Sequence, residues 1–106
     1  MKAANGKFDQ WREDAIFFTD QLEYSYSRCF YYEAESDRKP DLKPQLERWQ
    51  MYQEKALERI EQHYKRGQRW QIHDSSMRMI INNRLNLNLY FIVAKRLNQC
   101  AASLIS

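Results

Sequence analysis

Histidines and paired carboxylates are the residue types in this chain that could do chemistry, but their spacing offers no catalytic site. The two histidines are His63 and His73, and no Ser or Cys stands where it would serve either as a nucleophile. We therefore expect both to be surface imidazoles. Glu54 and Glu58 lie one helical turn apart on a polar face, so we expect solvated carboxylates rather than an acid–base pair.

Cysteines and glycines also lack the spacing of a cofactor site. Cys29 and Cys100 are far apart, sit among apolar residues and have no second Cys or His at ligand spacing, so we expect two reduced core thiols. Gly6 and Gly67 cannot together form a phosphate-binding loop. We accordingly expect that the chain is not an enzyme and that it binds no metal and no cofactor.

The segment of residues 63–71, HYKRGQRWQ, is the best candidate for nucleic-acid binding. Lys65, Arg66 and Arg69 supply cations for phosphates, and the neighbouring Trp70 supplies a flat ring for base stacking. A structural interpretation stays open, because cations in the last turn of a helix also complement its dipole. In that case Trp70 would close the core.

Charge is segregated along the chain, whose net charge is +3. Residues 1–61 carry ten basic and thirteen acidic side chains, a balance of −3, whereas residues 62–106 carry seven basic and one acidic, a balance of +6. No acidic residue follows Asp74. Such asymmetry predicts a negatively charged partner, either an acidic protein surface or DNA or RNA. The basic residues that we expect to be uncompensated beyond this point are Arg78, Arg84, Lys95 and Arg96.

Apolar spacing predicts two long helices that would position these residues. Over residues 8–35 apolar side chains recur at alternating steps of three and four without Gly or Pro, which predicts one helix. Pro40 ends it, and residues 44–66 form a second amphipathic helix that Gly67 terminates. The two helices make an antiparallel hairpin. Its expected buried seam is Trp11, Phe18, Leu22, Trp49 and Ile60.

Residues 77–93 fit two descriptions. Odd-numbered positions are apolar except Asn83, a strand-like alternation that allows a β-hairpin within residues 68–93 turning near that residue. In contrast, Asp74 and the two serines after it are typical of a helix start, and the last fifteen residues carry a helical apolar face. A continuous helix would turn the apolar face of its first half nearly opposite to that of its second half.

A second aromatic set lies on a face of the first helix distinct from the seam. Phe17, Tyr24 and Tyr31 recur every seven residues, and Phe30 stands beside them. Either a third helix covers this set within one chain, or the set contacts a partner, since Tyr and Trp are enriched at interfaces. Together with the opposed apolar faces after residue 77, it favours a homodimer.

We therefore expect a single all-α domain over residues 1–106, a long antiparallel hairpin plus a C-terminal helix in a three- or four-helix bundle; the alternative is an α+β fold. The expected function is a non-enzymatic protein–protein interaction module, a small accessory or regulatory factor on a larger protein machine such as a replication or transcription complex. The alternative is a nucleic-acid-binding regulatory protein that uses the basic C-terminal third. Apolar runs are too short to cross a membrane and no hydrophobic signal opens the chain, so we expect a cytoplasmic protein.

Overall fold

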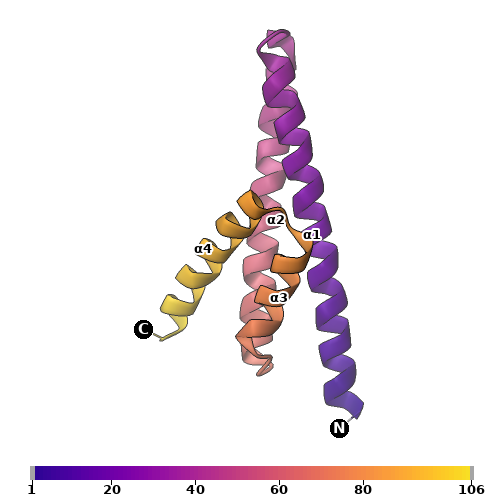
Figure 1. Ribbon diagram of the computed structural model, residues 1–106, viewed down its shortest axis with the longest axis vertical. Helices are drawn as coiled ribbons and strands as arrows, with labels where there is room; N and C mark the ends of the chain where they lie inside the picture. The colour runs from indigo at the N-terminus through magenta and orange to yellow at the C-terminus, as the bar shows by residue number, and fades with distance from the viewer. Residues whose placement is uncertain (1, 106) are drawn as a thin grey trace.

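The computed structural model describes the backbone of residues 2–105 and the side chains of residues 6–102. Within this part of the chain every regular element is a helix, so the all-α prediction is confirmed. Two long antiparallel helices form a hairpin, a third lies along its lower half, and the fourth leads away from the middle of the hairpin (Figure 1). The elements are α1 (Lys2–Ser36), the 3-10 turn η1 (Pro40–Leu42), α2 (Lys43–Arg69), α3 (Asp74–Arg84) and α4 (Leu87–Ile105).

The predicted hairpin seam is present. Leu22 is fully buried, and Trp11 and Ile60 are each only 1 % exposed. Phe18 and Trp49 were expected in the core but are only half-buried. Trp49 lies in the second turn of α2, close to the hairpin tip, whereas α3 and α4 lie beside the lower half of the hairpin (Figure 1), so neither of these two described helices covers Trp49.

Proline ends α1 as expected. Lys39 has extended backbone angles (φ −129°, ψ 86°), as the residue before a proline should, and Pro40 opens η1. Pro44 then occupies the first turn of α2, where the missing N–H costs nothing.

The prediction that Gly67 terminates the second helix is wrong, because α2 continues to Arg69. Gly67 has ordinary helical geometry, and a Cβ atom there would lie 2.8 Å from Nε1 of Trp11. The residue therefore serves the close approach of α1 to α2 and not the helix end. The left-handed residue of the turn is Gln71 (φ 61°), and the Ile72 N–H closes the turn by donating to the Gly67 carbonyl at 2.8 Å.

The β-hairpin alternative is also wrong, since Asn83 lies inside α3. Nor is the helix continuous, because the backbone becomes extended at Leu85. Asn86 then caps α4 by accepting a hydrogen bond from the Leu89 N–H at 2.9 Å. This break lets the two opposed apolar faces both turn inward. The buried residues that the two helices contribute are Met77, Ile80 and Ile81 from α3, and Leu89, Val93, Leu97 and Cys100 from α4.

Candidate interaction surfaces

His63 is a core residue, so the expectation of a surface imidazole is wrong for it. Its ring is 2 % exposed and stacks on Trp11 with centroids 5.0 Å apart. Two hydrogen bonds join the pair: Trp11 Nε1 donates to the His63 carbonyl at 3.1 Å, and His63 Nε2 lies 2.7 Å from the Trp11 carbonyl. Since a carbonyl only accepts, Nε2 carries the proton and the buried Nδ1 is left without a partner. Burial lowers the pKa of His63, which keeps the ring neutral.

The other candidate chemical groups are structural or solvated. His73 caps α3 by accepting from the Ser75 N–H at 3.1 Å. Cys29 and Cys100 are free thiols in the core, and burial raises the pKa of both, which disfavours the reactive thiolate. In the described residues no three His, Cys, Asp or Glu side chains come together as metal ligands.

Three of the C-terminal arginines have acidic partners, so the expectation that they are uncompensated is wrong for these three. Arg84 bridges to Asp20 on α1 at 2.7 Å. Arg96 reaches α2, where it contacts Glu54 at 2.7 Å and Glu61 at 2.9 Å. These pairs could not be predicted from sequence spacing, because each of these two arginines pairs with a carboxylate on a helix more than thirty residues earlier in the chain.

Arg78, the third, belongs to a small network that fixes the start of α3. It donates to Asp74 at 2.7 Å and to Asn98 of α4 at 2.8 Å, while the Tyr64 hydroxyl donates to Asp74 at 2.5 Å. Burial acts to raise the pKa of Asp74, but the hydrogen bonds from Tyr64 and Arg78 outweigh it and hold the pKa below its usual value. Asp74 thus ties the start of α3 to α2 through Tyr64, and Arg78 ties α3 to α4 through Asn98.

The basic segment at the end of α2 remains open to solvent. Arg66, Arg69 and Trp70 are exposed and Lys65 is half-buried. None of these cations forms an ion pair with a described side chain. Trp70 is 44 % exposed and does not close the core; the Lys7 ammonium lies 5.8 Å from its ring centroid. Lys95 on α4 is likewise exposed.

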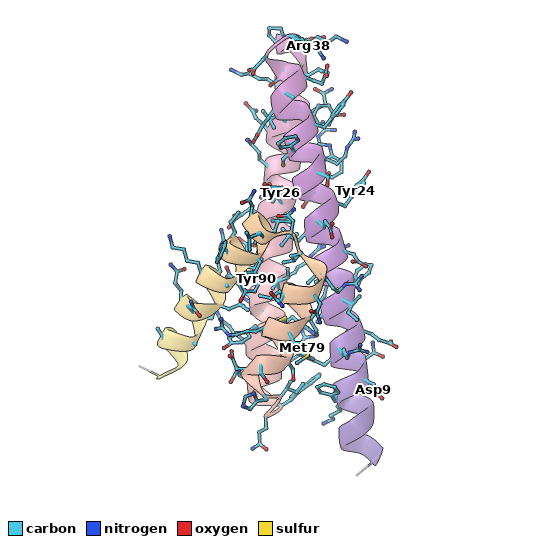
Figure 2. The ribbon with its side chains drawn as sticks, in the orientation of Figure 1. Asp9, Tyr24, Tyr26, Arg38, Met79 and Tyr90 are labelled. Carbon is cyan, nitrogen blue, oxygen red and sulfur yellow. The ribbon has the colours of Figure 1, made fainter. Side chains whose placement is uncertain are left out.

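The aromatic row of α1, defined as Phe17, Tyr24 and Tyr31, is not covered by a third helix. Its members are 56 %, 59 % and 50 % exposed, and the neighbouring Phe30 is 69 % exposed. Tyr24 lies along the edge of α1 away from α3 and α4, as does Asp9 farther down the helix (Figure 2). The interpretation in which the third helix buries this row is therefore wrong.

A cation–aromatic cluster that the sequence analysis missed lies in the groove between α1 and α2. Tyr24 packs edge-to-face on Trp49 at 5.5 Å, and Trp49 does the same with Tyr52 at 5.3 Å. The Arg28 guanidinium lies 5.1 Å from the Tyr32 ring centroid and 5.7 Å from that of Trp49. A signal was available, because residues 24, 28 and 32 follow one another at i, i+4 spacing on α1.

This groove is a shallow hollow of about 280 Å³ that contains cations and aromatic rings but no carboxylate. Arg59 is anchored across it by donating to Gln21 at 3.2 Å, and Lys55 stands one turn away. Such a lining suits a partner that brings negative charge together with apolar surface. The lining residues are Gln21, Tyr24, Ser25, Trp49, Tyr52, Lys55, Ala56 and Arg59.

Comparisons of the chain with protein-family models, with curated proteins and with solved structures found no match. The function must therefore be inferred from the molecule alone. None of the helices described in residues 2–105 has the length and apolarity to span a bilayer.

Proposed function

We propose that this chain is a non-enzymatic interaction module that binds another protein and acts as an accessory or regulatory factor on a larger protein machine in the cytoplasm. The observation that carries the proposal is the exposure of the aromatic row, whose three members are each at least half open to solvent. A lone exposed apolar residue needs no explanation, but three rings repeating along one helix face form a patch. Aromatic patches of this kind supply the binding energy of many protein interfaces.

The charge around the row supports an acidic partner. Lys55 and Arg59 border the groove beside Tyr24, and neither forms an ion pair with a described side chain. A partner that presents carboxylates at this place would gain electrostatic attraction in addition to the burial of aromatic area. Rim charges of this kind mainly accelerate association.

Nucleic-acid binding is the second candidate, and the open end of α2 is the observation that favours it. Arg66, Arg69 and Trp70 are exposed side by side, and Lys65 lies among them. Cations near an exposed ring are the features of a single-strand binding surface. The pairing of Arg84 and Arg96 with carboxylates removes cations from the wider surface that this function would use.

Co-purification from the native host tests the first proposal. We compare the tagged wild type with a triple variant, Phe17→Ser with Tyr24→Ser and Tyr31→Ser, and with Met79→Ser as the control. Met79 is a fair control because it is 63 % exposed but lies on α3, away from the row. We expect the wild type and the control to retain one defined protein in fixed ratio to the chain, and the triple variant to lose it. Retention of the same proteins by all three would contradict the proposal.

Binding to labelled single-stranded DNA at low salt tests the second candidate. If the chain binds nucleic acid here, its affinity for the DNA should fall steeply as the salt concentration rises. Arg66→Ala or Arg69→Ala should then reduce the slope of log affinity against log salt concentration by about 0.7 for each phosphate that the variant no longer neutralises. An absence of binding at low salt, or slopes unchanged in both variants, would exclude nucleic acid at this segment.

A further inference from the structure

Basic and acidic side chains lie on different sides of α2. Arg48, Lys55, Arg59 and Arg66, here called the basic stripe, are all exposed and follow one another at seven- and four-residue steps along one side of the helix. None of them forms an ion pair with a described side chain. The carboxylates of α2 lie on another side, and Arg96 of α4 occupies two of them. The basic stripe is thus a surplus of positive charge without an acidic partner among the described residues of its own chain.

The outward face of α1 has the opposite character. Asp9, Glu13 and Asp20, here called the acidic edge, are exposed and lie next to the aromatic row on the helix surface. Asp20 shares its carboxylate with Arg84, but about half of its side chain stays in solvent. Asp9 and Glu13 have no cationic partner among the described side chains. The acidic edge and the aromatic row together form an acidic, amphipathic helix face.

The intervals of the two charged faces agree. Asp9 and Glu13 are four residues apart, as are Lys55 and Arg59, and each interval spans about 6 Å along a helix axis. Two helices that carry opposite charges at the same interval can pair them along a shared apolar seam, as in a coiled coil. The groove brings the surfaces together, since Tyr24 of the aromatic row lines it with Lys55 and Arg59.

The chain already docks α4 on α2 by pairing opposite charges beside a buried apolar stripe. α4 lays the buried side chains of Leu89, Val93 and Leu97 toward the core, and Arg96 at the edge of that stripe bridges to Glu54 and Glu61 of α2. One side of α2 is thus acidic and holds a helix that brings a cation. The other side is basic and borders only α1 among the described helices, through Arg59 and Gln21. No described carboxylate pairs with the basic stripe, so the complementary occupant is a helix that brings carboxylates.

We propose that the occupant is a second copy of this chain, with α1 of each copy seated on the groove and basic stripe of the other. The resulting homodimer is isologous, because both contacts are the same acidic edge on the same basic stripe. It buries both aromatic rows and pairs charges that are unpaired in one chain. The inference rests on the proposed role of the aromatic row as a contact surface. The row is then buried between the two copies, and the accessory role belongs to the assembled dimer.

Charge reversal tests this arrangement. One variant carries Asp9→Lys with Glu13→Lys, and the other carries Lys55→Glu with Arg59→Glu. Each variant alone brings like charges together at both contacts of a symmetric dimer, whereas a one-to-one mixture restores attraction at both. The matched controls reverse exposed charges outside the two faces, Asp37→Lys at the hairpin tip and Lys95→Glu on α4. Circular dichroism of every variant checks that the helices are intact.

Sedimentation equilibrium measures the mass and the dimer affinity of each variant. We expect the wild type and both controls to reach twice 13.0 kDa at micromolar concentration, each reversed variant to dimerise at least about tenfold more weakly, and the mixture to regain the wild-type affinity. A wild type that stays at 13.0 kDa, or reversed variants that do not complement each other, would overturn the proposal. So would a monomeric wild type that binds labelled oligothymidylate through Lys55 and Arg59, because nucleic acid would then be the occupant.

The outcomes separate this inference from the proposed function. A monomer whose aromatic row still retains a defined cellular protein refutes the second-copy contact and leaves the interaction module standing. A complementing dimer that retains no other protein supports the contact and refutes the accessory role.

Discussion

Replacing Gly67 by Ala should destabilise the protein, although Ala is the better helix former. A Cβ at residue 67 would lie 2.8 Å from Nε1, 3.0 Å from Cε2 and 3.1 Å from Cζ2 of Trp11. The indole cannot move away freely, because it is 1 % exposed, stacks on His63 and donates to the His63 carbonyl. The added methyl group must therefore push a buried ring and weaken that hydrogen bond.

The expected change in the free energy of unfolding is the sum of two costs and one gain. Overpacking a core costs about 1–3 kcal/mol, and weakening the indole hydrogen bond costs about 1 kcal/mol more. The gain in helix propensity on replacing Gly67 by Ala offsets about 1 kcal/mol. The net effect is a loss of roughly 1–3 kcal/mol, which lowers the melting temperature by about 4–8 °C for each kcal/mol.

Gly6 is the matched control, since it is also helical and a Cβ there meets nothing within 4 Å. Gly6→Ala should raise stability by about 0.5–1 kcal/mol through backbone entropy alone. Urea unfolding followed by circular dichroism measures both variants. If Gly67→Ala were as stabilising as Gly6→Ala, the close approach of α1 to α2 at Trp11 would not be a constraint and the account of this glycine would fail.

Three further predictions concern the core and the helix ends. Leu22→Ala should cost about 2–5 kcal/mol in urea unfolding, because the side chain is fully buried; a cost under about 0.5 kcal/mol, as expected for exposed Met79→Ala, would contradict the seam. The lowered pKa of His63 means that the unfolded chain takes up a proton first, so stability should fall as the pH drops below about 6.5, and His63→Gln should remove that dependence. Asn86→Ala should cost about 1 kcal/mol and speed amide exchange at Leu89; unchanged exchange would exclude the cap.

The hairpin could be predicted because its cause is local. Apolar residues at steps of three and four put Trp11, Leu22 and Ile60 on single helix faces, and a long helix with one apolar face must bury it. Proline acts on its immediate neighbour, so the end of α1 near Pro40 could also be predicted. Each inference needed only residues within a few turns of one another.

What could not be predicted depends on packing between distant segments. The place of Gly67 in the interior of α2 follows from Trp11, and the burial of His63 follows from the same ring. Arg84 meets Asp20 across sixty-four positions, so counting charges along the chain overestimated the free cations of the C-terminal third. The aromatic row was identified correctly as a separate face, but only the positions of α3 and α4 showed that no described helix covers it.

We propose that the aromatic row of α1 makes its contacts outside its own chain. The most direct test places the photo-crosslinker benzoylphenylalanine at position 24 in the native host, with position 79 as the exposed control. We predict a crosslinked product that is specific to position 24 and contains either another protein or a second copy of the chain, the latter product having twice the mass of one chain. A crosslinking pattern at position 24 that is no different from that at position 79 would contradict it.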